Sequence, residues 1–199
     1  MFLKRQEGHQ RRTFRHPFRG EPTFSCEFNM MCYLREHGVP APVPVFFGER
    51  IVEKRPQAIL MTEELKGYRS LEEVTDELSR QGAPSLSLKR GILRAVADTV
   101  RKLHGARIQH RSLYPKHLFV RLIATGGAEV TVIDLEKSRV KLIPAIRSVY
   151  DLATLNRHAR FWSRSDRIYF LHQYFGVPRL TQWQRLLCGL IIKRSNRRK

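Results

Sequence analysis

The segment HRSLYPKHLFV, at residues 110–120, constrains the fold of this chain more than any other part of it. Its apolar end forms the run HLFVR, and a second apolar run, EVTVID, ends at Asp134, fourteen residues after Val120. The turn residues ATGG lie between the two runs, so the pattern predicts a β-hairpin. Such a hairpin has basic and hydroxyl side chains before its first strand and a carboxylate at the end of its second.

Extended and helical patterns alternate along the first part of the chain. FLKRQ near the N-terminus indicates a strand, and apolar residues at helical spacing predict a helix from about Pro22 to Gly38 that carries Glu27. The runs PVFFGERI and QAILMTEEL flank the charged turn EKRP and predict an antiparallel hairpin. The tract from Arg11 to Glu21 is basic and rich in turn-forming residues, so a loop is expected there.

Two helices are expected before the central segment. SLEE at 70–73 is a capping box that begins a short helix. Ser87 is expected to begin a longer helix, which ends near His104 and carries an apolar stripe of Ile92, Val96, Val100 and Leu103.

Three more helices are expected after the hairpin. Their sequences are VYDLATLNRHARF, SDRIYFLHQYF and TQWQRLLCGLIIKR, with Ser165 and Thr181 as N-caps and the breaker GVP between the last two. The order of elements is therefore strand, helix, strands and then mostly helices.

The composition indicates a folded chain with a strongly basic surface. Of the 199 residues 42% are hydrophobic, and 37 Lys and Arg against 18 Asp and Glu give a net charge of +19. Such a surface attracts polyanions, which include nucleic acid, anionic lipid and phosphorylated glycan. Cys26, Cys32 and Cys188 lack the CxxC spacing and an even count, so we expect buried thiols in a reducing compartment. The absence of an apolar signal segment and of an apolar run of about 18 residues favours a cytoplasmic protein.

Four groups of residues fit a site for phosphoryl transfer when they are taken together. Such a site needs cations for the phosphates and a metal ion held by hard ligands, and little covalent help from the protein. Lys4 lies in the first apolar run, where it can pair with Glu27 and reach nucleotide phosphates. His110-Arg111-Ser112 begins the central segment, His117 ends its polar part and Asp134 closes the hairpin.

The order of these motifs resembles the protein-kinase-like superfamily, and within it the bacterial lipopolysaccharide core-sugar kinases of the Kdo/WaaP and InaA-like group. The similarity extends from Phe2 to about Phe175 and rests on FLKRQ, EFNMMCYLREHGV, ILMTEEL, LHGARIQHRSLYPKHLFV, VIDLEKSR and VYDLATLNR. The central segment keeps the His, Arg, Leu and Pro of the kinase catalytic loop H-R-D-L-K-P-E-N. A histidine in place of the asparagine of that loop is a feature of the lipopolysaccharide kinases.

The resemblance implies an α+β, two-lobed, protein-kinase-like fold formed as one domain over residues 1–199. Residues 1–66 would form a partial N-terminal lobe, and residues 67–199 a mainly helical C-terminal lobe with a basic tail. The implied reaction is transfer of the γ-phosphoryl group of ATP to a sugar hydroxyl of the lipopolysaccharide inner core. Lipopolysaccharide or its core-sugar precursor would then be the partner.

The resemblance also assigns roles by position. Lys4 would bind the phosphates of ATP and Glu27 would hold Lys4. The backbone of Glu63, Glu64 and Leu65 would bind adenine, and Mg²⁺ would be held by His117 and Asp134. Asp151, in the helix after the hairpin, would support the backbone of the catalytic loop.

Two departures from the kinase pattern affect the expected activity. Ser112 stands where the catalytic aspartate belongs, and a serine hydroxyl does not accept a proton at neutral pH without a base of its own. Loss of a general base costs roughly 10²–10⁴ in rate, so slow transfer or a pseudokinase that binds nucleotide or anionic glycolipid are both open. The glycine-loop hairpin that precedes the lysine strand of kinases is also missing, because Lys4 is the fourth residue. Either the chain starts late relative to a longer product, which is favoured, or it has lost this cover.

Simpler readings exist for the same residues. Lys4 has the character of a charge that protects an edge strand, and Glu27 has Arg35 as an alternative partner. Asp134 has the alternative of a turn residue, and His117 that of a core histidine. For Asp151 the alternative is a carboxylate stabilised by a helix N-terminus.

The last predicted helix has two readings. Trp183, Leu186, Leu187, Leu190 and Ile191 precede the basic sequence KRSNRRK, which indicates either a helix packed on the body or an anchor on an anionic membrane surface. The basic tract from Lys4 to Arg19 would act with it, at the inner face of the inner membrane. Nonspecific binding of nucleic acid is the least favoured function, because no zinc-finger, RNP or KH motif accompanies the charge.

Overall fold

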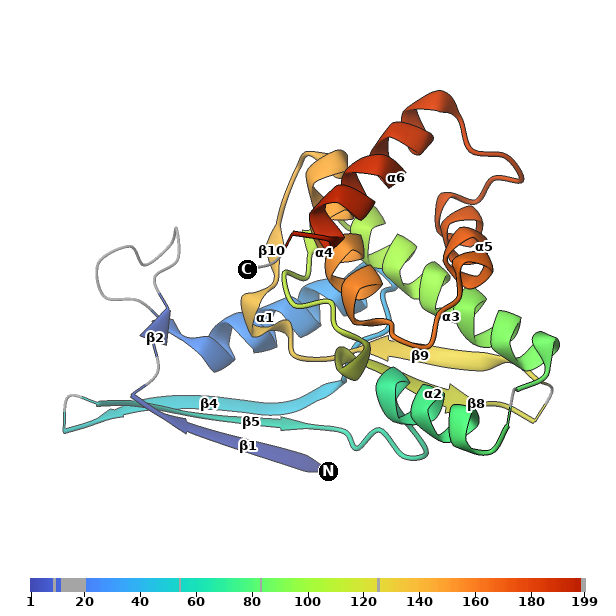
Figure 1. Cartoon of the computed structure of the whole chain (residues 1–199). Helices are drawn as coiled ribbons and strands as arrows, with labels where there is room; N and C mark the ends of the chain where they lie inside the picture. Colours follow the sequence, from blue (N-terminus) through green and yellow to red (C-terminus); the bar gives the residue numbers. More distant parts are fainter. Residues whose placement is uncertain (9, 12–20, 54, 83, 125, 198–199) are drawn as a thin grey trace.

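One antiparallel sheet and one helix form the N-terminal part of the computed structural model (Figure 1), which describes residues 1–8, 10, 11, 21–53, 55–82, 84–124 and 126–197. The sheet has the strand order β1-β5-β4, with β1 at Phe2–Glu7, β4 at Pro44–Val52 and β5 at Arg55–Thr62. Helix α1, at Thr23–Glu36, packs against β4 and β5. The short strands β2 (Gln10–Arg11) and β3 (Glu21–Pro22) pair just before the helix begins.

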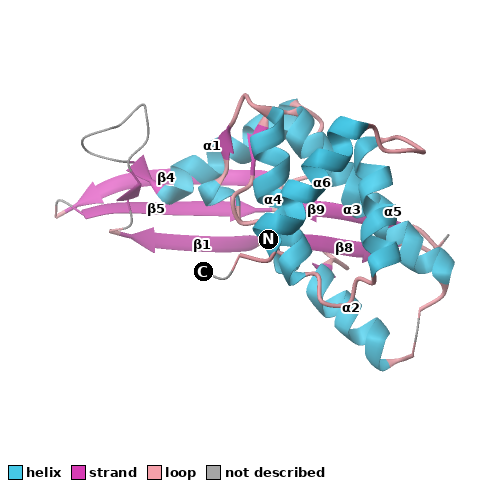
Figure 2. Ribbon diagram, turned by 45° about the horizontal axis from the view of Figure 1, so that its top comes forward, coloured by secondary structure: helices cyan, strands magenta, loops and turns pink. Residues whose placement is uncertain are grey.

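Helices surround two small sheets in the C-terminal part (Figure 2). One sheet has the order β6-β8-β9, formed by Arg69–Ser70, Leu118–Leu122 and Ala128–Val132. The other pairs β7 with β10, formed by Ile108–Gln109 and Arg139–Val140. The helices are α2 (Leu71–Arg80), α3 (Leu86–Gly105), α4 (Pro144–His158), α5 (Arg164–Phe175) and α6 (Gln182–Ser195). Two short 3₁₀ helices, η1 (Pro115–His117) and η2 (Leu135–Lys137), lie at the start and end of the β8-β9 hairpin.

A continuous apolar core joins the two parts. Leu34 of α1 and Leu60 of β5 belong to the same buried cluster as the stripe of α3 and residues of β8 and β9. The predicted stripe of α3 is confirmed, since Ile92, Val96, Val100 and Leu103 are all buried. Each fully buried leucine contributes roughly 1.5–3 kcal/mol, so this shared core holds the sheet and the helices together.

Both predicted hairpins are confirmed. In the first, β4 and β5 pair antiparallel from Pro44 opposite Thr62 to Val52 opposite Arg55, and Glu53 in the turn has a left-handed φ of 48°. In the second, the pairing runs from Leu118 opposite Val132 to Leu122 opposite Ala128. The stop of α1 is also as predicted.

Two of the predicted helix caps are wrong. The N-cap of α3 is Ser85, whose hydroxyl accepts the amide of Leu88 at 3.2 Å, whereas Ser87 lies inside the helix. The N-cap of α5 is Ser163 and not Ser165, because Ser163 forms a reciprocal capping box with the residue three positions later. In each case two serines are near the helix start, and the extended backbone of the earlier one fits the N-cap position. The predicted caps Ser70 and Thr181 are confirmed.

Helix α4 is longer at its start than its apolar pattern indicates. It begins at Pro144, and the fixed φ of proline suits the first helical position. Five residues that the sequence leaves outside the helix therefore belong to it, and the helix ends at His158 rather than at Phe161.

Two further expectations need comment. Only the ends of the expected loop from Arg11 to Glu21 are described; these two residues pair in the β2-β3 ladder, and residues 12–20 lie outside the described part.

The three cysteines, Cys26, Cys32 and Cys188, are partly buried rather than buried, because they lie beside the buried faces of α1 and α6. Partial burial raises the pKa of the Cys188 thiol. Within the described residues, no helix is long and apolar enough to cross a bilayer.

Candidate functional site

Lys4 of β1 and Glu27 of α1 form an ion pair. The Lys4 Nζ lies 2.8 Å from Oε1 and 3.0 Å from Oε2 of Glu27. The carboxylate is almost fully buried, with 1% of the residue exposed, while 31% of the lysine side chain is exposed. A buried carboxylate is costly unless it is paired, so this contact fixes Lys4 at the edge of the sheet with part of its side chain toward solvent.

The alternative roles considered for Lys4 and Glu27 are only partly confirmed. β1 is an edge strand, as expected for a protective charge, but its lysine is committed to the carboxylate of α1. In the described part of the chain, Arg35 forms no ion pair with Glu27. The predicted pairing therefore forms, whereas the role of Lys4 toward a nucleotide stays a prediction.

The segment Glu63–Leu65 connects β5 to the C-terminal part. Its Glu63 amide donates to the carbonyl of Val43 at 2.9 Å, and the Leu65 carbonyl accepts from Tyr68 at 3.1 Å. Among the described residues, no backbone hydrogen bond uses the carbonyl of Glu63 or the amide of Leu65. An acceptor and a donor on one extended segment can bind the edge of a purine base, so the geometry is compatible with the predicted adenine contact.

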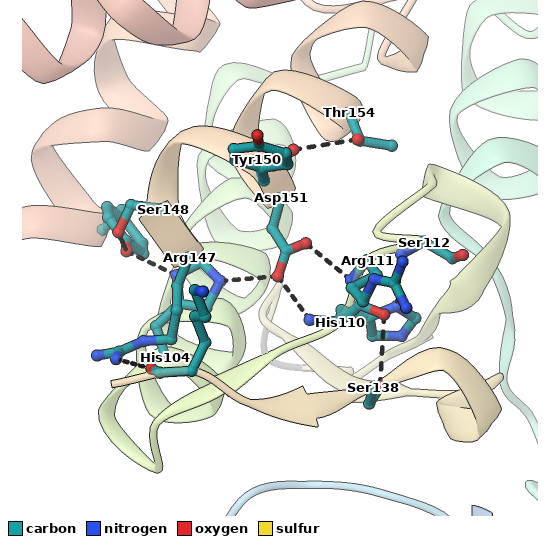
Figure 3. A network of polar contacts seen from close by, with 12 residues as sticks. His104, His110, Arg111, Ser112, Ser138, Arg147, Ser148, Tyr150, Asp151 and Thr154 are labelled. Carbon is teal, nitrogen blue, oxygen red and sulfur yellow. Dashed lines mark hydrogen bonds and ion pairs between the residues drawn. The ribbon is translucent and has the colours of Figure 1, made fainter. Parts of the chain in front are cut away.

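The loop between β7 and η1 is held by the carboxylate of Asp151 (Figure 3). Asp151 is fully buried in the middle of α4, and its oxygens accept the amides of His110 at 2.7 Å and Arg111 at 2.9 Å. Arg111 has a left-handed φ of 67°, a conformation that costs about 1 kcal/mol or more and needs such support. The predicted support of the loop is confirmed, and the alternative of a helix N-terminus is wrong because Asp151 lies beyond the first turn.

A second contact of Asp151 was not predicted from the sequence. His104, in the last turn of α3, donates from Nε2 to Asp151 at 3.2 Å, and its Nδ1 lies 2.7 Å from the hydroxyl of Tyr174. The Tyr174 hydroxyl is also 2.7 Å from the hydroxyl of Ser148, and burial raises the pKa of Tyr174 to about 12. The signal in the sequence was His104, a histidine on the buried side of a helix near its end.

His110 is a neutral structural residue. Its Nε2 lies 2.9 Å from the carbonyl of Ile133, which can only accept, so Nε2 carries the hydrogen. Its Nδ1 then accepts the amide of Ser112 at 3.3 Å. Burial lowers the pKa of His110, which agrees with this neutral form.

The backbone around Ser112 is tightly bound, and only 5% of the residue is exposed. Its carbonyl accepts the amide of Tyr114 and the Nδ1 of His117, both at 2.8 Å. The direction of the side chain at this position is therefore set by the loop. Because the residue is serine, this position lacks the carboxylate that accepts a proton in kinases.

His117 and Asp134 come together at the start and end of the β8-β9 hairpin. The Nδ1 of His117 lies 3.3 Å from Oδ2 of Asp134, in addition to its bond to Ser112. Because Nδ1 donates to a carbonyl, Nε2 keeps its lone pair for a metal ion or a phosphate proton. Asp134 has a left-handed backbone, with φ 60° and ψ 58°, and 32% of its side chain is exposed. The core-histidine and strand-end turn readings do not account for this pairing.

These two ligands fit Mg²⁺ better than a structural metal. The described residues contain no group of three or more His, Cys, Asp and Glu side chains that could hold a metal ion. Mg²⁺ keeps several waters and is bound through one or two carboxylates plus substrate phosphates, which matches a single, partly exposed aspartate. The nitrogen of His117 is a softer ligand than oxygen, so Asp134 is the stronger of the two candidates.

The two pairs lie on elements that pack together. Helix α1, which carries Glu27, packs against η2, which begins directly after Asp134. The sheet lysine and the hairpin carboxylate are therefore attached to one packed junction between the N- and C-terminal parts. This junction therefore carries the residues that the sequence predicts for binding a nucleotide and its metal ion.

Known proteins share this sequence and fold. The sequence model of the lipopolysaccharide kinase (Kdo/WaaP) family matches residues 1–174. Protein InaA of Escherichia coli strain K12 is 32% identical over 145 residues, which are 71% of this chain and 64% of InaA. The lipopolysaccharide core heptose(I) kinase WaaP of Pseudomonas aeruginosa is 30% identical over 159 residues, 76% of this chain and 59% of that protein. The chain thus spans about three fifths of the length of these curated relatives.

A solved structure of WaaP in complex with acyl carrier protein has a TM-score of 0.69 and 27% sequence identity to this chain. The matched region covers 85% of this chain and 72% of the WaaP chain. The α+β, kinase-like fold predicted from the sequence is confirmed by this similarity.

Proposed function

Because the chain belongs to the lipopolysaccharide kinase (Kdo/WaaP) family, we propose that it is an ATP-dependent phosphotransferase for a sugar hydroxyl of the lipopolysaccharide inner core. The observation that carries the proposal is the ion pair of Lys4 with the buried Glu27, on a helix that packs beside Asp134. A partly exposed lysine held by a buried carboxylate is a means of presenting one positive charge at a fixed place. Phosphoryl transfer depends chiefly on such positioning and on electrostatic stabilisation.

Each residue of the junction has a defined task in this proposal. Lys4 binds phosphate oxygens, and Glu27 prevents the lysine from leaving the site. The segment Glu63–Leu65 binds adenine through its backbone, between the sheet part at 1–66 and the helical part at 67–199. Asp134, with His117, holds Mg²⁺, and the metal when bound neutralises charge on the transferred phosphoryl group.

A second candidate function is nucleotide or glycolipid binding without turnover, and Ser112 is the observation that favours it. No carboxylate occupies the position at which kinases abstract the proton of the acceptor hydroxyl. Positioning and metal binding remain, so the proposed enzyme transfers phosphate slowly instead of losing activity completely. The two candidates differ in turnover and share the nucleotide site.

Contact with an anionic membrane surface is part of the proposal. Leu187 and Ile191 of α6 are buried, whereas Trp183, Leu186 and Leu190 are 61%, 63% and 50% exposed. The helix thus packs on the body and also presents an apolar stripe near its basic end, which suits the interface of an anionic leaflet. A position on the cytoplasmic side of the membrane would give the protein access to a lipid-linked acceptor.

The test of the proposed function is transfer of labelled γ-phosphate from ATP to purified lipopolysaccharide inner core. We expect Mg²⁺-dependent incorporation of label into the acceptor, at a low rate because Ser112 is no base. Asp134→Asn removes the charge of the hard ligand with little change in size, and incorporation should then fall to background. Incorporation that persists unchanged in Asp134→Asn, or that is absent with every acceptor preparation, would reject the phosphotransferase function.

A further inference from the structure

Five arginines line one cavity of about 490 Å³ beside the catalytic loop. They are Arg111 of the loop, Arg139 of β10, Arg157 of α4, and Arg194 and Arg197 at the end of α6. We propose that this cavity binds a phosphomonoester already present on the sugar acceptor, and so orients the acceptor hydroxyl toward Ser112. The proposal rests on the phosphotransferase function and adds a recognition site to it.

The charge of the cavity is strongly one-sided. Among the described residues that line it, Asp151 is the one carboxylate, and this group already accepts three hydrogen bonds, from His104, His110 and Arg111. Among the described carboxylates, none forms an ion pair with Arg139, Arg194 or Arg197. Guanidinium groups that reach one cavity from several directions can bind the several oxygens of a phosphate. Each guanidinium group can form two parallel hydrogen bonds with such oxygens.

Two of the arginines are held in place by the protein. The guanidinium of Arg194 lies over the ring of Tyr150, with 3.4 Å between its central carbon and the ring centroid. Arg157 donates to the backbone carbonyls of Arg194 and Ser195 at 2.8 and 2.9 Å, and to Arg197 at 3.1 Å. Arg157 therefore fixes the end of α6 over the cavity. A preorganised site loses less entropy when a ligand binds.

Gln109 lines the same cavity and has a buried, unpaired side-chain oxygen. Gln109 is 2% exposed, and its Oε1 is one of three buried side-chain polar atoms without a hydrogen-bond partner among the described residues. A buried amide oxygen without a partner costs roughly 1–3 kcal/mol.

The position of the cavity indicates which substrate it serves. Arg111 precedes Ser112 directly, and Arg139 begins the strand that follows Asp134 by five residues. The cavity thus adjoins the loop that contains Ser112, where the acceptor hydroxyl is proposed to bind. It also adjoins the segment that follows Asp134, the proposed metal ligand. A nucleotide bound at Lys4 has its own cation, so Arg139, Arg194 and Arg197 are left for the acceptor.

The test uses D-glucose 6-phosphate as a soluble probe, with D-glucuronate and D-glucose beside it at fixed ionic strength and without nucleotide. We expect the phosphate to bind, the carboxylate to bind more weakly and the neutral sugar not to bind in calorimetric titrations. The double variant Arg139→Gln with Arg194→Gln should weaken binding of the phosphate about tenfold or more. Arg157 is left intact because it caps α6.

The control has the same change of net charge at exposed arginines outside the cavity. Arg80→Gln with Arg179→Gln should change the affinity for the probe less than twofold. Equal losses in the two double variants, or full affinity in the cavity variant, would overturn the site. Binding of anionic phospholipid vesicles in a cavity-dependent manner without any binding of glucose 6-phosphate would overturn the assignment to the acceptor sugar.

Failure of this site is distinguishable from failure of the proposed function. The stabilisation by Mg-ATP should be the same in the cavity variant and the parent, because Lys4 and Asp134 are untouched. In the transfer assay the variant should show a raised KM for a phosphorylated acceptor with kcat little changed. A lower kcat at unchanged KM would assign the arginines to the chemical step and contradict a role in acceptor binding.

Discussion

Replacing Ser112 by aspartate is expected to raise the rate of phosphoryl transfer by about 10²–10⁴-fold, the usual contribution of a general base. The loop is already built for it, because hydrogen bonds from Tyr114 and His117 hold the Ser112 carbonyl, each at 2.8 Å. The side chain of an aspartate would leave the backbone in the same direction as the serine. Burial of the site would raise the pKa of the new carboxyl group and bring it closer to that of an effective base.

The matched control is Ser112→Asn, which has the shape of aspartate and cannot take up the proton. The measurement is the initial rate of label transfer to lipopolysaccharide inner core at saturating Mg-ATP, with the thermal midpoint of each variant determined in parallel. Equal rates in the aspartate and asparagine variants, both folded, would show that this position does not serve the acceptor hydroxyl.

Replacing Asp151 by alanine is expected to lower the free energy of unfolding by about 3–5 kcal/mol. The carboxylate is fully buried and accepts three hydrogen bonds, and bonds to a charged group contribute roughly 1.5–3 kcal/mol each. Its removal leaves the amides of His110 and Arg111 without their partner and the left-handed Arg111 without support. Urea unfolding followed by circular dichroism measures the change.

Asp98→Ala is the control for this prediction. Asp98 forms ion pairs with Arg101 and Lys102 on the exposed side of α3, and exposed pairs contribute between about 0 and 1 kcal/mol. If Asp151→Ala costs no more than Asp98→Ala, the carboxylate does not hold the loop in solution. The asparagine variant of Asp151 should lie between the two, since one amide oxygen can accept part of the set.

Most of the helices and strands could be predicted, because the spacing of apolar residues within each segment indicates its secondary structure. The two hairpins and the stripe of α3 follow from alternation and helical spacing, which depend on the chain alone. The start of a helix is harder to predict where two residues near it can each serve as the N-cap. Ser85 and Ser87 have the same capping chemistry, and the extended backbone of the first decides between them. The first turn of α4 begins with proline and has no side-chain N-cap, so no capping motif in the sequence marks its start.

The site was predictable to the extent that it follows a linear motif. Lys4 and Glu27 are far apart in sequence, and their pairing was expected only because the whole order of motifs resembled kinases. The 2.8 Å contact in the structure agrees with it. The arginine cavity has no such motif. Its members come from a loop, a short strand and two helices, which meet through the packing of α4 on α6 and the pairing of β7 with β10. The only sequence signal was the excess of positive charge.

We propose that Lys4, Glu27, His117 and Asp134 surround one nucleotide and its metal ion. Thermal unfolding in the presence of Mg-ATP tests it most directly, because a ligand at one hundred times its Kd stabilises the folded state by about 2.7 kcal/mol. For a chain of this size that raises the midpoint by about 5–11 °C. We predict this rise for the parent with Mg-ATP, a smaller rise with ATP and EDTA, and no rise for Lys4→Met or Asp134→Asn. An unchanged midpoint of the parent at millimolar Mg-ATP, or an equal rise in all three proteins, would contradict the account.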